Sequence, residues 1–172
     1  MSGIFSSSIA RKVVMALSAL FLIIFLIIHV AVNLTSLFSA EVFNELSHFM
    51  GTNPLIQFGM QPILIFGVVL HFVLGFFLEI QNRRSRNVSY VKYHGSASAS
   101  WMSRNMIYSG AAILAFIALH FVDFWFPEIN HKYIEVLPED PGRYYHELQE
   151  KFLSPWRVGA YVVAFVLLSL QA

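Results

Sequence analysis

Long apolar runs separated by polar segments form the main pattern along this chain. Residues 13–33 are almost entirely apolar and, at about 20 residues, long enough to cross a hydrocarbon layer of roughly 30 Å. Residues 63–80, 105–126 and 158–172 are further runs of this kind. The pattern predicts an all-α integral membrane protein, a transmembrane helix bundle in which residues 1–172 form a single domain with about four spans.

The fourth apolar run is too short for a complete span. Its 15 residues, at about 1.5 Å each, cover only ~22 Å, which is less than the thickness of a membrane. A free carboxylate after Ala172 would also lie in hydrocarbon. We therefore expect this span to be incomplete, with the protein continuing beyond Ala172.

The polar segments carry signals for shorter elements and for helix ends. Residues 40–50 read as an amphipathic helix lying at the membrane interface. Pro62 suits the first turn of a helix, where its missing N–H costs nothing, whereas Pro127 should stop the third span. We expect another short helix at residues 142–152, after which Pro155 opens the fourth run.

Basic side chains set the expected orientation. Arg11 and Lys12 precede the first span, and the segment between the second and third spans is basic without any acidic residue. The other two loops are neutral or acidic, so the positive-inside rule places the N-terminus and the basic segment in the cytoplasm, with the chain in the cell inner membrane. The basic residues of that segment are Arg83, Arg84, Arg86, Lys92 and Arg104.

Composition narrows the class of protein. The chain is 57% hydrophobic and 12% charged, with a mean hydropathy of +0.63, which is too apolar for a soluble domain of this size. A net charge of +1 argues against a nucleic-acid partner. The absence of cysteine excludes disulfides and directly bound iron–sulphur clusters. Seven histidines make imidazole the leading candidate ligand.

Three histidines, His29, His71 and His120, fall inside apolar runs, where ionisable groups are costly and indicate function. His29 and His120 each lie 16 residues from the inner boundary of their spans, or roughly 24 Å. His71 lies 11 residues in, or roughly 16 Å, in a second layer. Two imidazoles at matched depth on helices that run in parallel are what axial ligation of a haem requires.

The same residues also fit plainer roles. A single histidine could hydrogen-bond across the bundle, and Gly67 and Gly75, on the same helical face as His71, serve either a flat macrocycle or close helix packing. A zinc site is less attractive because no carboxylate or thiolate lies at either depth. The nearest acidic residues, Glu79 and Asp123, lie near span ends, and we interpret both as solvated at the interface.

Three stretches together resemble the cytochrome b membrane subunit of succinate:quinone oxidoreductases: RKVVMALSALFLIIFLIIHVAVNL, HFVLGF around His71, and SRNMIYSG leading to His120. The closer resemblance is to the single-subunit, dihaem type of menaquinone-using succinate dehydrogenases and fumarate reductases. It implies five transmembrane helices and two bis-histidine haems b. It also implies two partner subunits, a flavoprotein with FAD, which performs the dicarboxylate chemistry, and an iron–sulphur protein. This subunit would carry electrons between the clusters and menaquinone.

The resemblance also assigns the histidines. His29 and His120 match the ligand pair of the distal haem, and His71 matches one ligand of the proximal haem. The second proximal ligand should come from the fourth helix, but residues 158–172 contain no histidine, and the fifth helix is missing. Truncation before that ligand accounts for both gaps, and true loss of one haem is the rival hypothesis.

The remaining candidates are polar groups near the span ends. Quinone is expected to bind near the distal haem, where the candidate residues are Asn33, Glu41, His48 and Gln61. For each of these residues the alternative role is ordinary solvation at the membrane interface. Basic residues could pair with haem propionates or dock the soluble subunits, although topology alone accounts for them: Arg83, Arg84 and Arg104.

Two other functions fit the same pattern. A cytochrome b anchor of a hydrogenase or formate dehydrogenase would share the intramembrane histidines and the soluble partners. A non-redox membrane protein would use the histidines for proton relay or packing. The sequence leaves open the direction of the reaction, the quinone, the haem potentials and the oligomeric state of the complex.

Overall fold

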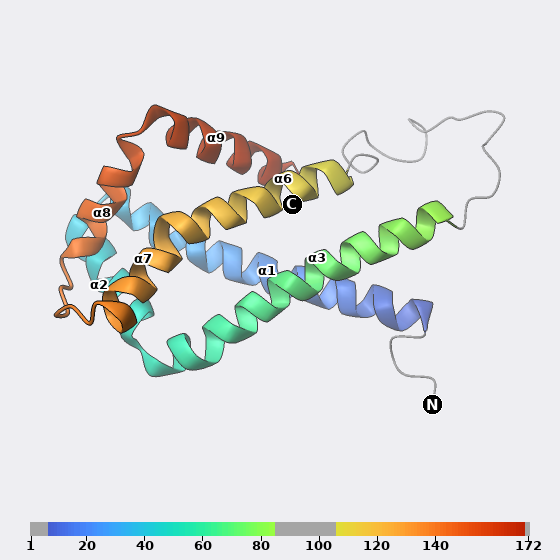
Figure 1. Ribbon diagram of the computed structural model, residues 1–172, viewed down its shortest axis with the longest axis horizontal. Coiled ribbons are helices and arrows are strands. Elements are labelled where there is room, and N and C mark those ends of the chain that lie inside the picture. Colours follow the sequence, from blue (N-terminus) through green and yellow to red (C-terminus); the bar gives the residue numbers. More distant parts are fainter. Residues whose placement is uncertain (1–6, 85–105, 171–172) are drawn as a thin grey trace.

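The computed structural model describes residues 7–84 and 106–170, and within these ranges the chain is helical and contains no strand. Three helical runs in this part of the chain are long and apolar enough to cross a membrane: Ser8–Leu37, Leu55–Arg84 and Ile107–Ile134. Figure 1 shows them as long rods joined by shorter helices at one end of the molecule. The expectation of an all-helical fold is confirmed for the described residues, and the three long apolar runs are consistent with a multi-pass membrane protein.

The first span and the helix after it begin at serine caps. In α1 (Ser8–Leu34) the Ser7 hydroxyl accepts a hydrogen bond from Ala10 N at 3.5 Å. In α2 (Ala40–Thr52) Ser39 accepts one from Val42 N at 3.2 Å, which satisfies an amide that has no partner inside the helix. The short helix expected at residues 40–50 is therefore present.

The second span begins earlier than its expected range of residues 63–80. A π-helical turn, Leu55–Met60, leads directly into α3 (Gln61–Arg84). Pro62 does lie in the first turn of α3, but the helical run does not start there. A proline lacks its N–H and crowds the carbonyl four residues back, and the wider π turn before it accommodates both effects.

The third span passes through Pro127, so the expected stop at that residue is wrong. α6 (Met106–His120) continues through a π turn, Phe121–Trp125, into α7 (Phe126–Ile129) and a second π turn, Asn130–Ile134. The π turn again precedes the proline, and it removes the clash that would end a regular α-helix.

The C-terminal part is a bent pair of helices. α8 (Arg143–Phe152) agrees with the short helix expected at residues 142–152, and α9 (Pro155–Ser169) begins at Pro155, three residues before the expected fourth run. The two helices meet at 96° and count as a further span only if they are taken together. In Figure 1, α9 folds back along α6.

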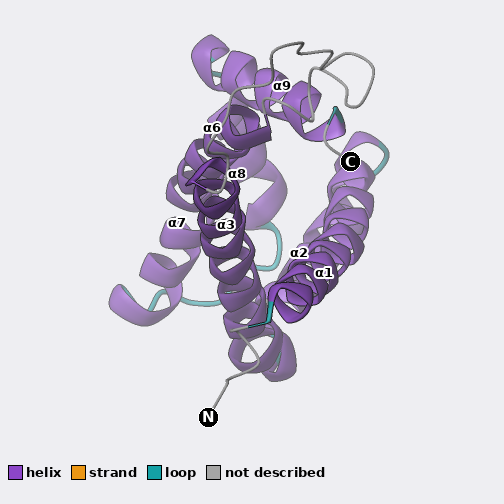
Figure 2. Ribbon diagram, turned by 90° about the vertical axis from the view of Figure 1, so that its right-hand side faces the viewer, coloured by secondary structure: helices purple, strands orange, loops and turns teal. Residues whose placement is uncertain are grey.

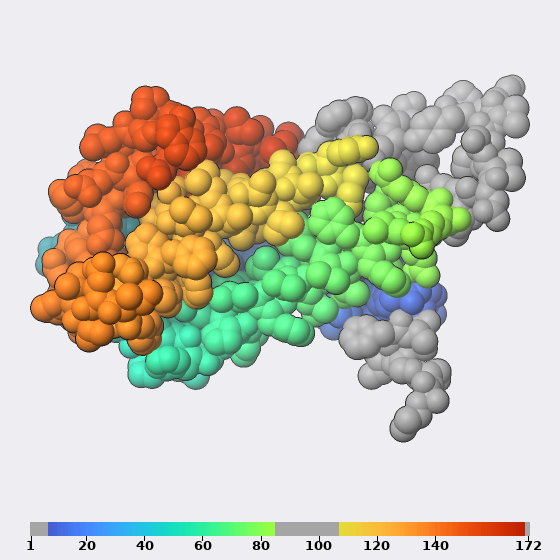
Figure 3. All heavy atoms as spheres, viewed as in Figure 1, coloured from blue at the N-terminus to red at the C-terminus, as the bar shows by residue number. Residues whose placement is uncertain are grey.

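Packing is concentrated in a few helix pairs. α1 packs on α3, α6 packs on α9 and, less closely, on α3, and α2 packs on α8. Figure 2 shows α3, α6 and α7 as one column, with α1 and α2 beside it. Most apolar side chains of the spans are exposed, as expected for helices that contact lipid. Figure 3 shows the three runs lying along one another with all atoms drawn. The buried apolar residues in the described ranges are Phe43, Leu74, Ile113, Tyr161 and Ala164.

Candidate functional site: a histidine pair between two spans

The imidazoles of His29 in α1 and His120 at the end of α6 meet inside the bundle. Their ring centres are 5.6 Å apart and the ring planes are perpendicular. α1 and α6 are not among the closely packed helix pairs, so these two side chains reach across a wider interhelical space. The structure therefore brings together the two histidines that matched depth had paired.

Aromatic rings surround the pair. Phe25 stacks on His29 with ring centres 5.4 Å apart, and Phe116 and Phe124 lie 6.1 and 5.2 Å from His120. Asn33, one helical turn after His29, donates its amide to His29 O at 2.8 Å and lies 3.4 Å from His29 Nε2. Because an amide N–H needs an acceptor, His29 Nε2 carries a lone pair and Nδ1 carries the hydrogen.

A buried polar chain leads away from His120. Its Nδ1 lies 3.5 Å from the hydroxyl of Tyr161 in α9, and that hydroxyl donates to Asp123 Oδ2 at 3.2 Å. Arg157 Nε lies 3.0 Å from Asp123 Oδ1 as an ion pair. The Tyr161 hydrogen is used toward Asp123, so its oxygen accepts the hydrogen of His120 Nδ1, which leaves a lone pair on Nε2.

The interpretation of Asp123 as an interfacial, solvated residue is wrong. Its side chain is only 1% exposed and is held by Arg157 and Tyr161, because a buried carboxylate needs a charge partner and hydrogen bonds. Glu79 keeps the expected character: it is partly exposed and pairs with Arg83 at 2.7 Å. The spacing in the sequence could have indicated the buried position of Asp123, because Asp123 follows His120 by three residues and shares its helix face.

His71 occupies a separate layer. Its Nδ1 lies 3.0 Å from the hydroxyl of Ser18, and that hydroxyl donates its own hydrogen to Met15 O at 2.8 Å. Ser18 must therefore accept the hydrogen of His71 Nδ1, which leaves the lone pair of His71 on Nε2. His71 therefore lies at the level of Ser18, which precedes His29 by 11 residues in α1, or about 16 Å along the axis. This separation between the His71 layer and the His29 layer is roughly twice the difference between the two depths counted from the sequence.

The glycines beside His71 pack helices together. A Cβ atom on Gly67 would lie 3.0 Å from Phe21 Cε1, and one on Gly75 would lie 3.3 Å from Met15 Cε. Both glycines thus let α3 approach side chains of α1 closely. Close packing of α1 on α3 is thus the role that the structure shows for these two glycines.

The quinone candidates do not form one site. Asn33 lies at His29, Glu41 is exposed in the first turn of α2, and His48 Nε2 lies 3.9 Å from Glu139. Gln61 instead lines a cavity of about 170 Å³ between the start of α3 and the end of the third span. The cavity is lined by Gln57, Phe58, Gln61, Pro62, Ile65, Trp125, Ile129 and Tyr133.

One residue that lines this cavity has a polar atom without a partner. Trp125 Nε1 is buried and has no hydrogen-bond acceptor among the described residues. Tyr133, from the same helical run, donates its hydroxyl hydrogen to Gln57 Oε1 at 3.1 Å. An indole N–H is a donor only, so a ligand that reached Trp125 would have to accept a hydrogen bond.

The basic candidates are only partly placed. Arg83 pairs with Glu79 at the end of α3, and Arg84 beside it is exposed. Arg104 lies outside the described residues, as do Arg86 and Lys92.

A second charged cluster joins α2, α7 and α8 and was not expected from the sequence. Glu128 pairs with both Lys132 and Arg143, and Lys132 also donates to Gly51 O. Burial, together with the charge of Glu128, raises the pKa of Tyr144 in α8 to about 12. The cluster therefore fastens these helices to one another.

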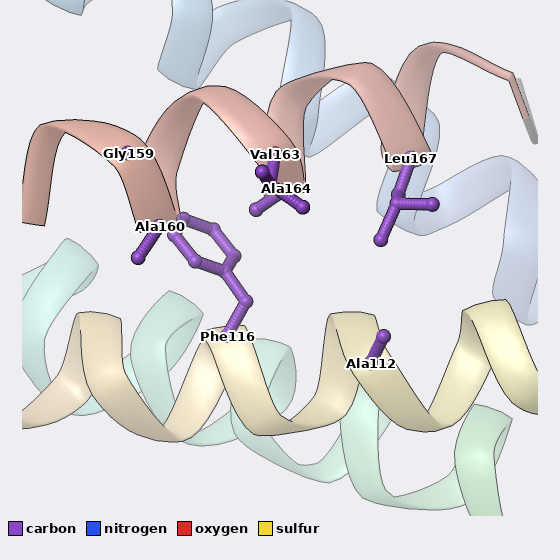
Figure 4. Close-up of a pocket in the computed structure, with 7 residues that line it drawn as sticks. All are labelled: Ala112, Phe116, Gly159, Ala160, Val163, Ala164 and Leu167. Atoms are coloured by element: carbon purple, nitrogen blue, oxygen red, sulfur yellow. The ribbon is translucent and has the colours of Figure 1, made fainter. Parts of the chain in front are cut away.

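A groove of about 330 Å³ runs between α6 and α9 (Figure 4). Phe116, which also packs on His120, extends from α6 toward Ala160 of α9. The lining is entirely apolar, so the groove offers no ligating or hydrogen-bonding side chain. The lining residues are Ala112, Phe116, Gly159, Ala160, Val163, Ala164 and Leu167.

A scan of protein-family models, a search of curated proteins and a search of solved structures each found no match to this chain. What the chain does has therefore to be inferred from its residues and their geometry.

Proposed function

We propose that this chain is a haem b-binding membrane-anchor subunit of a succinate:quinone oxidoreductase, which carries electrons between an iron–sulphur subunit and menaquinone. The observation that carries the proposal is the imidazole pair of His29 and His120, which meet from two spans with ring centres 5.6 Å apart. Imidazoles presented from facing helices are how a bundle holds a haem.

The residues at the pair fit a haem. His29 and His120 would hold the haem iron, one from each span, and their ring centres lie 5.6 Å apart. No three histidine, aspartate or glutamate side chains gather at one point in residues 7–84 and 106–170, whereas a haem takes only two axial nitrogens from the protein.

The hydrogen bonds also favour ligation. His71 and His120 each have Nε2 as the nitrogen with the lone pair, because the hydroxyls of Ser18 and Tyr161 accept the hydrogen on Nδ1. A ligating imidazole is commonly held in this way, through its other ring N–H. Ligation by His29 requires the Asn33 amide to turn away from Nε2.

A haem held by His29 and His120 would supply one-electron transfer. The protein orients the two imidazoles and surrounds them with Phe25, Phe116 and Phe124, which keep the pair in an apolar environment. As part of this proposal His71 binds a second haem, with its other ligand from outside the described residues, in a five-helix dihaem bundle.

The proposed setting follows the resemblance. Dicarboxylate chemistry takes place on an FAD-containing flavoprotein subunit, next to the iron–sulphur subunit, on the cytoplasmic side of the inner membrane. The N-terminus lies on that side because of Arg11 and Lys12. Arg83, Arg84 and Arg104 belong to the same side and are available to the soluble subunits or to haem propionates.

The quinone is proposed to bind in the cavity that Gln61 and Trp125 line. Trp125 follows His120 by five residues, or ~7.5 Å along a helix, so the cavity lies close to the histidine pair. A quinone carbonyl is an acceptor and would satisfy the buried Trp125 N–H. Asn33, Glu41 and His48 have other surroundings and are not assigned to this cavity.

A reduced-minus-oxidised absorption spectrum of the purified protein, with a haem-to-protein ratio, tests the proposal. We expect a bis-histidine b-type spectrum and co-purification of flavin and non-haem iron under mild detergent. A colourless protein would favour a non-redox role for the histidines. A coloured complex that oxidises hydrogen or formate instead of succinate would assign the anchor to another respiratory enzyme.

A further inference from the structure

We infer that Tyr161, backed by Asp123 and Arg157, is a positioning residue that lowers the reduction potential of the group held by His120. The inference rests on the proposed function, because it concerns the haem that His29 and His120 would hold. It assigns a role to a buried polar chain that electron transfer through the histidine pair does not itself require.

The first step is the direction of the hydrogen bonds. The Tyr161 hydroxyl has one hydrogen, and Asp123 Oδ2, 3.2 Å away, is an acceptor when ionised. The Tyr161 oxygen is therefore free to accept from His120 Nδ1, 3.5 Å away. This holds His120 in the tautomer that presents Nε2 to a metal.

The second step is the charge behind the hydroxyl. Asp123 is 1% exposed and lies 3.0 Å from the Arg157 guanidinium, so the buried carboxylate has a charge partner. A hydroxyl that donates to a carboxylate is a stronger acceptor, because hydrogen bonds in a chain polarise one another. The Tyr161 oxygen thus accepts a stronger hydrogen bond from His120 Nδ1 than an isolated hydroxyl would.

The third step is the effect on the metal. An acceptor on the far N–H of a ligating imidazole raises the basicity of the imidazole. A more basic axial ligand favours the oxidised metal, so the reduction potential falls; axial ligation and the hydrogen bonds behind it are among the means by which a protein sets that potential. The His29 imidazole is placed differently, since its ring nitrogen lies against the neutral Asn33 amide.

The alternative is that Tyr161 matters only through the packing of its ring, and the test has to distinguish this from the role of its hydroxyl. Its ring contacts Phe116 and Phe152 edge-on, with centres 4.8 and 4.9 Å apart, and it is 4% exposed. If packing were its only role, phenylalanine would replace it well and glutamine poorly. If the hydrogen bond matters, glutamine keeps an acceptor for His120 and a donor for Asp123, whereas phenylalanine keeps neither.

The experiment is a potentiometric haem titration of the intact complex carrying Tyr161→Phe or Tyr161→Gln. We expect Tyr161→Phe to raise the midpoint potential of the haem that His29 and His120 share. The expected size is about tenfold in the reduced-to-oxidised ratio, or ~59 mV for one electron. Tyr161→Gln should lie closer to the wild-type potential, despite its poorer packing.

Tyr145→Phe is the matched control, because it removes a hydroxyl in α8 for which the described residues provide no hydrogen bond, while its ring keeps the contact with Phe43. If either Tyr161 variant lowers haem occupancy, the same order applies: glutamine should retain more haem than phenylalanine. An unchanged potential in Tyr161→Phe, a fall in it, or glutamine behaving worse than phenylalanine would overturn the inference. A wild-type protein without haem would instead reject the proposed function.

Discussion

The hydroxyl of Ser18 accepts the Nδ1 hydrogen of His71 at 3.0 Å and thereby ties the middle of α1 to the middle of α3. Ser18 is 8% exposed and sits between Met15 and Phe21, the two α1 residues that face the glycines of α3. This contact is polar in an otherwise apolar helix pair. It fixes both the packing of the two spans and the tautomer of the histidine.

Replacing Ser18 with Ala should therefore destabilise the protein. The half-buried His71 N–H would lose its acceptor, and the loss of such a hydrogen bond costs about 0.5–1.5 kcal/mol. Thermal unfolding in detergent measures the loss. Ser169→Ala is the matched control, because the Ser169 hydroxyl donates to the Val166 carbonyl of its own helix. Equal stability of the two variants would contradict the role of Ser18.

Alanine substitutions of His29 and His120 should remove the same spectral component. Both imidazoles belong to one proposed haem, so the loss of either removes an axial ligand of the same iron. His71→Ala should remove a different component. His146→Ala, at an exposed side chain, should leave the spectrum unchanged. Loss of different components from His29→Ala and His120→Ala would disprove the pairing.

Replacing Arg157 with Ala should destabilise the protein more than replacing its ion-pair partner Asp123 with Ala. Arg157→Ala leaves a carboxylate that is 1% exposed without its charge partner, at a cost of about 3–5 kcal/mol. Asp123→Ala leaves Arg157, which at 27% exposed is less buried than Asp123, so we expect about 1–3 kcal/mol. Unfolding measured by circular dichroism ranks the two variants, and the reverse order would refute this account of the pair.

Gly67→Ala should weaken the contact between α1 and α3. The added Cβ would lie 3.0 Å from Phe21 Cε1, and the ring must move to accept it, at a cost of about 1–3 kcal/mol. Gly159→Ala provides the comparison, since a Cβ there meets nothing within 4 Å. In that helix alanine should stabilise by about 0.5–1 kcal/mol. Opposite signs of the two stability changes are the expected result.

Trp125→Phe should weaken quinone binding. It removes the buried N–H that has no acceptor in the described part of the protein, and a hydrogen bond contributes about 0.5–1.5 kcal/mol, or ~3–10-fold in KM for a soluble naphthoquinone. Trp156→Phe, at a side chain that is 59% exposed, should leave KM unchanged. If the two variants behave alike, quinone binds elsewhere.

The spans could be predicted from the sequence because their apolar runs are long, and the histidine pair because depth follows from helical rise. The span ends could not. A proline such as Pro62 or Pro127 usually lies at the boundary of a regular α-helix. Nothing in the local composition shows that a π turn precedes each of them and lets the helix continue.

The polar chain behind His120 also could not be predicted from the sequence. The position of Asp123 on the helix face of His120 is visible, but its partners Tyr161 and Arg157 come from a helix that follows 32 residues after it. The Glu128 cluster is similar. Its pair with Lys132 has helical spacing and can be read from the sequence, whereas its pair with Arg143 depends on how α7 and α8 turn against each other.

The π turns before Pro62 and Pro127 lie in two different helices, yet residues of both line the cavity at Gln61 and Trp125. A π turn holds one residue more than an α turn. Each helix therefore carries the equivalent of a one-residue insertion at the cavity wall, and the space depends on chain length as well as on side-chain identity. Deleting one residue from either turn would rotate the adjoining helical segment by about 100° and dismantle the cavity, even with every lining side chain retained.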